Sequence, residues 1–135
     1  MIGVVICCHA QLWQSLLDAG EMILGELSNA TAVAIEPGNS GEEILDKLST
    51  AIEGVDSGSG VIVLCDMFGG TPSNVSLTLM SEAVEIVTGA NLPMLLKLFT
   101  SRHLPLFELA DVIQKHSRDN ILVAGALLGT RGNKE

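Results

Sequence analysis

Two residues that could carry out group transfer each follow a short apolar run. His9 ends the run IGVVICCH, and Asp66 follows the run VIVLC. An imidazole with one nitrogen bonded to a carboxylate is held in one tautomer and one orientation, and its other nitrogen stays available as a nucleophile. If the two runs are neighbouring strands, the pair predicts a histidine that accepts a phosphoryl group.

After Asp66 the chain continues as MFGGTPSN, which is suited to a corner that holds an anion. Gly69 and Gly70 permit backbone angles that other residues rarely adopt. A helix beginning near Thr71 would point free amide groups and its positive end at the corner, and the Thr71 hydroxyl can donate to a phosphate oxygen. We therefore interpret Gly69, Gly70 and Thr71 as a phosphate-binding corner beside the predicted pair.

Each of these residues taken singly also has a structural interpretation. A histidine at a strand end is usually a packing or surface residue, and Asp66 can be a turn residue that bonds local amides. Thr71 can be only an N-cap, worth about 1 kcal/mol. The functional interpretation is favoured because all of them fall at one predicted edge of a sheet.

The remaining sequence predicts the elements that must position these residues. Ser40 and Glu43 match a capping box at a helix start. In the helix after the GGTP corner, Val75, Leu79 and Met80 are expected to face the core. Short apolar runs predict strands at 2–8, 31–35, 61–65, 84–87 and 121–128, with helical spacing of apolar residues between them.

Alternating strands and helices predict an α/β fold with an open, mostly parallel sheet and helices on both faces. In a flavodoxin-like strand order the first and third strands are neighbours, so His9 and Asp66 project into one crevice. Ligands of such sheets bind beyond the carboxyl ends of the strands, where the strand order reverses. No internal repeat or linker is visible, and we expect one domain over residues 1–135.

The composition excludes several classes of partner. There are 16 acidic and 7 basic residues, for a net charge of −9, and aromatic residues make up 3% of the chain. Such a surface should repel nucleic acid and anionic lipid, and it lacks aromatic platforms for stacking bases. No apolar run approaches the ~20 residues that cross a bilayer, and no basic signal region is present. We expect a cytoplasmic protein without membrane insertion.

Together these motifs resemble the enzyme IIA component of the mannose family of the bacterial phosphoenolpyruvate-dependent sugar phosphotransferase system, over nearly the whole chain. The resemblance is carried by VVICCHAQL, VIVLCDMFGGTPSN, NLPML at 91–95 and the final apolar strand. It implies a phosphohistidine carrier without cofactor or metal. His9 would accept phosphate from the histidine-containing phosphocarrier protein and pass it to a separate IIB component for sugar uptake and phosphorylation, with Asp66 orienting His9 and Thr71 assisting.

The resemblance also implies a homodimer. Its last strand, 121–128, would run antiparallel and be exchanged between the two copies. The identity of the sugar cannot be inferred from this sequence, because a IIA component contacts proteins and never the sugar. The chain ends at Glu135 without an attached IIB region, so we expect the IIB component to be a separate protein.

Three other functions remain open from the sequence. Phosphorylation of the same histidine could signal to a non-transport target, because both roles need an identical acceptor. Cys7, Cys8 and Cys65 lie near the two site residues and could belong to a zinc or redox module. We favour packing for these thiols, because successive strand side chains point to opposite faces. The phosphotransfer subunit of dihydroxyacetone kinase shares the fold, but its pattern after the third strand differs.

Two further histidines are given no role. His103 is expected in a loop that can reach the rim of the site. His116 is expected at the solvated end of a helix.

Overall fold

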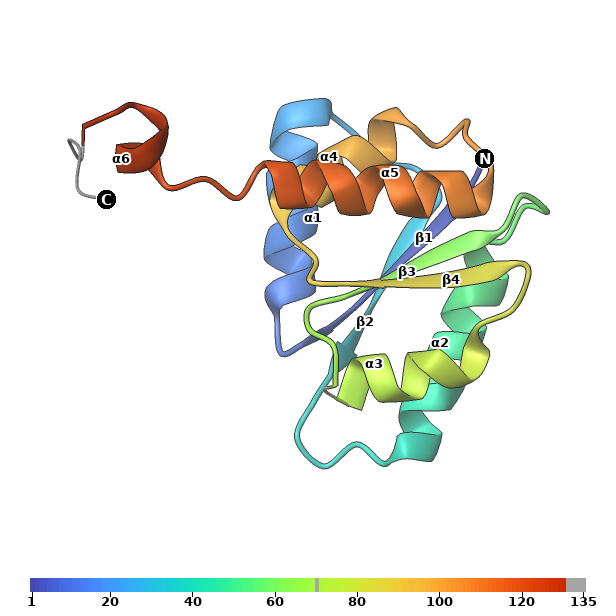
Figure 1. Ribbon diagram of the computed structural model, residues 1–135. Coiled ribbons are helices and arrows are strands. Elements are labelled where there is room, and N and C mark those ends of the chain that lie inside the picture. Colours follow the sequence, from blue (N-terminus) through green and yellow to red (C-terminus); the bar gives the residue numbers. More distant parts are fainter. Residues whose placement is uncertain (70, 131–135) are drawn as a thin grey trace.

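The computed structural model describes residues 1–69 and 71–130 and contains an all-parallel sheet with the strand order β2-β1-β3-β4 (Figure 1). The first and third strands are therefore neighbours, as predicted. The first four predicted strands are confirmed, each to within one residue at either end. Their bounds are β1 Gly3–His9, β2 Ala30–Ile35, β3 Val61–Cys65 and β4 Val84–Thr88.

Helices cover both faces of the sheet, which confirms the predicted layers. Helices α1, α4 and α5 lie on one face, and α2 and α3 lie on the other (Figure 1). The bounds are α1 Leu12–Leu24, α2 Gly41–Val55, α3 Thr71–Ser76, α4 Leu92–Thr100, α5 Leu106–Asp119 and α6 Ala124–Leu127, with a 3-10 turn η1 at Leu77–Leu79.

Local sequence chemistry fixes where two of the helices begin. Ser40 Oγ accepts a hydrogen bond from the backbone N–H of Glu43 at 3.1 Å, and its hydroxyl donates to the Glu43 carboxylate at 3.2 Å. Asn91 Oδ1 accepts from the backbone N–H of Met94 at 2.9 Å, with Pro93 in the first turn. A side-chain cap of this kind is worth about 1 kcal/mol. The predicted helix start at Ser40 is confirmed.

Strand β1 shows no polar alternation because it is buried on both faces. Val4, Ile6 and Cys8 pack in the layer under α1, α4 and α5. Val5 and Cys7 pack in the opposite layer, under α2. This double burial, which begins at Ile2, ends at His9, the last residue of the strand, which is exposed.

The predicted antiparallel strand at 121–128 is wrong. Residues 121–123 are irregular and lead into the short helix α6, and the segment extends away from the body of the fold (Figure 1). The sheet has no antiparallel fifth strand among the described residues, and exchange of such a strand is not supported. With no neighbouring strand to pair with, the backbone forms local bonds, as from Leu127 N–H to the Val123 carbonyl at 2.9 Å.

Met80 was also placed wrongly. Helix α3 ends at Ser76 and continues only as the 3-10 turn, so Met80 lies beyond the last turn in extended conformation. Its side chain is exposed, whereas Val75 and Leu79 pack against the core as predicted.

The register of the sheet determines where the strand ends meet. Cys7 pairs with Cys65, and His9 pairs with Ile35, so the residues that follow β1, β2 and β3 lie at one edge of the sheet. No helix in the described part of the chain is both long and apolar enough to span a bilayer.

Candidate functional site

His9 and Asp66 meet at the carboxyl edge of the sheet, as predicted. His9 Nδ1 lies 2.9 Å from Asp66 Oδ2. The same oxygen also accepts the backbone N–H of His9 at 2.9 Å. One carboxylate oxygen thus holds both the main chain and the ring of the histidine. This double contact fixes the ring with Nδ1 as the hydrogen donor to the carboxylate.

The Asp66 carboxylate is held in its charged form. Its side chain is 12% exposed, and burial raises the pKa of Asp66. Hydrogen bonds from the backbone and the ring of His9 outweigh burial, and the pKa of Asp66 lies below its ordinary value. The carboxylate is therefore available to stabilise positive charge on the imidazole.

The His9 side chain remains partly accessible to solvent. The side chain is 46% exposed, and Nε2 makes no hydrogen bond to any residue that the structure describes. A neutral ring that donates from Nδ1 has its lone pair on Nε2. The arrangement supplies an accessible nucleophile whose partner nitrogen is already bonded to an anion.

A pocket of about 410 Å³ opens beside His9. Thr71 lines it, so one predicted phosphate-binding residue lies at the same pocket as the histidine. Gly69 has φ of 89°, a left-handed conformation that favours glycine, and it follows Asp66 closely in the turn before α3. Gly70, the third predicted residue, lies outside the described residues.

Sequence reasoning missed the wall of this pocket that comes from the β2–α2 loop. Glu36, Pro37, Gly38 and Asn39 line the pocket. Asn39 Oδ1 accepts the backbone N–H of Glu36 at 2.9 Å and so closes the loop on itself. The available signal was turn chemistry directly after a parallel strand, because such a loop must lie at the same sheet edge as His9.

Ala10 was missed as well. It has φ of 51°, in the left-handed region that non-glycine residues rarely adopt, and its N–H donates to the Ile35 carbonyl at 3.2 Å. This residue turns the chain sharply out of β1, so that His9 stands at the end of the strand. No pattern in the sequence predicts a left-handed backbone conformation at this alanine.

Comparison with known proteins identifies the family. A sequence model described as "PTS system fructose IIA component", where PTS denotes the phosphotransferase system, matches residues 3–115. The chain belongs to this IIA family. It is 31% identical over 126 residues to the PTS system fructose-specific EIIA component of Bacillus subtilis (strain 168), covering 91% of this chain and 86% of that protein.

Other relatives of the IIA component agree. It is 32% identical over 103 residues to the PTS system mannose-specific EIIAB component of Escherichia coli (strain K12), covering 75% of this chain but only 32% of that longer protein. The fold matches the crystal structure of phosphotransferase system component EIIA from Streptococcus agalactiae with a TM-score of 0.85 and 26% identity, covering 93% and 99% of the two chains. These likenesses agree with membership of the IIA family.

The three cysteines of this IIA component are buried in two different layers. Cys7 and Cys65 pack on the α2 side of the sheet, and Cys8 packs on the opposite side. Burial raises the pKa of the Cys8 thiol to about 12. Among the described residues no three His, Cys, Asp or Glu side chains are grouped to hold a metal ion. The arrangement is that of packed thiols, since buried cysteine behaves as a small hydrophobe.

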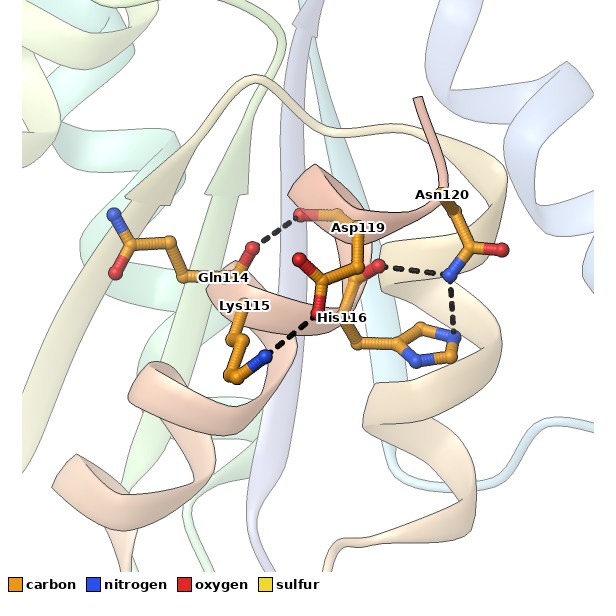
Figure 2. A network of polar contacts seen from close by, with 6 residues as sticks. Gln114, Lys115, His116, Asp119 and Asn120 are labelled. Atoms are coloured by element: carbon orange, nitrogen blue, oxygen red, sulfur yellow. Dashed lines mark hydrogen bonds and ion pairs between the residues drawn. The ribbon is translucent and has the colours of Figure 1, made fainter. Parts of the chain in front are cut away.

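Neither of the other two histidines is among the described residues that line the pocket beside His9. Arg102 donates to the carbonyls of Ile2 and Ser28, which precede β1 and β2, so the adjacent His103 lies at the amino edge of the sheet and its expected reach to the site is wrong. His116 lies in the last turn of α5, as predicted, and Figure 2 shows it beside Asn120, whose Nδ2 donates to the His116 carbonyl at 2.8 Å.

Proposed function

We propose that His9 is the phosphoryl acceptor of this IIA component and that Nε2 is the accepting atom. The single observation that supports this most is the 2.9 Å contact of Nδ1 with Asp66 Oδ2, with Nε2 making no hydrogen bond to the described residues. The donor is the phosphorylated histidine-containing phosphocarrier protein, and the acceptor is a separate IIB component. The physiological result is sugar uptake with phosphorylation.

The transfer is an in-line displacement between two nitrogens. The Nε2 lone pair of His9 attacks phosphorus while the N–P bond of the donor histidine breaks, and the donor ring leaves with its electron pair. The Nδ1 proton of His9 stays in its hydrogen bond to Asp66. Passage of the phosphoryl group to the IIB component reverses these roles. Positioning and charge stabilisation, with no metal and no cofactor, provide the catalysis.

Asp66 stabilises the phosphorylated ring. Forming the Nε2–P bond places positive charge on the imidazole, and the charged carboxylate is already bonded to Nδ1. A hydrogen bond to a charged group is worth about 1.5–3 kcal/mol, which is the scale of its contribution here. The side chain that fixes the ring thus also lowers the barrier to transfer.

The corner after β3 receives the phosphoryl oxygens in this proposal. Thr71 lines the pocket with His9, and its hydroxyl can donate to an oxygen. Gly69 allows the backbone of the turn to approach the anion, because it carries no side chain. Helix α3 has only 6 residues, so the hydroxyl and the amides matter more here than a long helix dipole.

The C-terminal segment supports a proposal that the protein is a homodimer. Five large apolar side chains in and next to α6 are more than half exposed, although such side chains are normally covered. They are Ile121, Leu122, Val123, Leu127 and Leu128. In this proposal the segment of one copy packs as it stands against an apolar surface of the other.

One experiment tests the acceptor and its residue together. The chain is incubated with phosphoenolpyruvate and the general phosphotransfer proteins, and then examined by intact mass and by peptide mapping under alkaline conditions that preserve phosphohistidine. We expect one added phosphoryl group on the peptide that contains His9, and its loss to a purified IIB component. An unlabelled chain, or a label on another peptide, would contradict the proposal. The His9→Ala variant is the control.

A further inference from the structure

We infer that Glu36, in the exposed surface around His9, selects the phosphate donor: its carboxylate favours a protein with basic groups near its phosphorylated side chain over a small anionic donor. The inference rests on the proposed function, because it concerns what docks over His9. It adds a residue from the β2–α2 loop that takes no part in the chemistry.

The apolar part of this surface comes from the loops after β1 and β3. Phe68 is 70% exposed, Met67 is 52% exposed, and Leu12 is 44% exposed. Met67 and Phe68 directly follow Asp66, and Leu12 begins α1 three residues after His9. Aromatic and methionine side chains are enriched at interfaces, where they supply contact area. A partner that reaches Nε2 of His9 must cover this part of the surface.

The charged part of this surface is acidic. Glu36 lines the pocket that His9 and Thr71 also line, and its side chain is exposed. Glu42 and Glu43 are exposed in the first turn of α2, which follows the same loop. Among the described residues, no lysine or arginine lines the pocket. The whole chain carries a net charge of −9, so this edge adds to a field that attracts a basic protein.

Glu36 also acts against other phosphate donors. A small anionic donor would bring its negative charge next to the Glu36 carboxylate, and the described residues of the pocket wall supply no compensating cation. A protein that carries basic groups around its phosphorylated side chain satisfies both the carboxylate and the phosphoryl group. Charge placed at an interface rim in this way sets the association rate and the choice of partner more than the final affinity.

The test compares Glu36→Gln and Phe68→Ala with matched variants at the other edge. Glu53→Gln removes an exposed carboxylate from the last turn of α2, and Phe107→Ala removes a phenylalanine that is 50% exposed at the start of α5. Each variant is phosphorylated with the phosphorylated histidine-containing phosphocarrier protein at several salt concentrations, and separately with phosphoramidate, a donor that needs no protein surface.

We expect Glu36→Gln to raise KM for the donor protein about 2- to 5-fold at low salt and to weaken the salt dependence of kcat/KM. Phe68→Ala should raise KM about 10-fold or more. Labelling by phosphoramidate should be faster in Glu36→Gln than in the wild type, because the repelling carboxylate is gone, and should stay within about twofold of the wild type in Phe68→Ala. The Glu53→Gln and Phe107→Ala variants should match the wild type with both donors.

Three results would overturn the inference. Wild-type KM and salt dependence in both variants would show that the surface does not dock the donor. Equal slowing with phosphoramidate would place Glu36 and Phe68 in the chemical step. A change in sedimentation of Phe68→Ala with unchanged KM would assign the surface to contact between copies. If wild-type His9 accepts no label from the donor protein, it is the proposed function that fails.

Discussion

The Asp66→Asn substitution removes the charge of the site while keeping its shape. Asp66 Oδ2 accepts two hydrogen bonds from His9, whereas Oδ1 is buried without a partner among the described residues. An asparagine can therefore place its carbonyl oxygen at the Oδ2 position and its amide nitrogen at the Oδ1 position. Both bonds to His9 can persist, and only their charge-assisted character is lost.

The expected cost follows from that lost charge. A hydrogen bond to a charged group contributes about 1.5–3 kcal/mol, against about 0.5–1.5 kcal/mol for a neutral bond. The difference, about 1–2 kcal/mol, acts when the ring gains positive charge during transfer. Since about 1.4 kcal/mol is a factor of ten in rate, phosphorylation of His9 should slow about 5- to 30-fold. Affinity for the donor protein should change little, because Asp66 is 12% exposed and offers little contact surface.

The assay is rapid-quench, single-turnover phosphorylation with labelled donor protein, with Asp18→Asn, an exposed change on α1, as the control. Labelling within twofold of the wild-type rate would refute the role of the carboxylate. An unchanged rate at saturating donor with a large loss of donor affinity would instead make Asp66 a docking charge.

Other consequences of the same geometry can be measured directly. His9→Ala should abolish phosphorylation yet lower the free energy of unfolding by less than about 1 kcal/mol, because the side chain is 46% exposed. Cooperative urea unfolding at a much lower midpoint would instead indicate a structural histidine. The pKa of Asp66 is lowered in the folded protein, so its carboxylate stabilises the fold above the unfolded pKa of about 3.9. This contribution is lost as the pH falls through the lower folded pKa. The difference in unfolding free energy between wild type and Asp66→Asn should therefore shrink between pH 7 and about pH 3. Deleting residues 121–135 should give a folded monomer by analytical ultracentrifugation, and a truncated chain that still sediments as a dimer would contradict dimerisation through this segment.

Much of the fold was predictable because its strands are buried on both faces. An apolar run such as Ile2 to Cys8 leaves little freedom of interpretation, and Ser40 with Glu43 marks a helix start through a specific pair of bonds. The meeting of His9 with Asp66 followed from topology alone, because parallel strands bring their carboxyl ends to one edge.

The errors have physical causes of a different kind. Residues 121–128 are apolar enough for a strand, but a strand needs a neighbour, and no strand among the described residues pairs with this segment. The left-handed Ala10 and the pocket wall at Glu36 depend on tertiary contacts, such as the bond from Ala10 N–H to Ile35, that no local pattern records. His103 was misplaced because sequence proximity to a loop says nothing about which sheet edge the loop serves.

The central claim is that the hydrogen bond between Asp66 and Nδ1 of His9 directs the phosphoryl group to Nε2. Two-dimensional ¹⁵N–¹H NMR of the phosphorylated protein, labelled at the histidine ring nitrogens, measures this directly, because the phosphorylated nitrogen changes its chemical shift and couples to phosphorus. The account predicts phosphorus coupling at Nε2 of His9, with Nδ1 still protonated. Coupling at Nδ1, or at no nitrogen of His9, would contradict it.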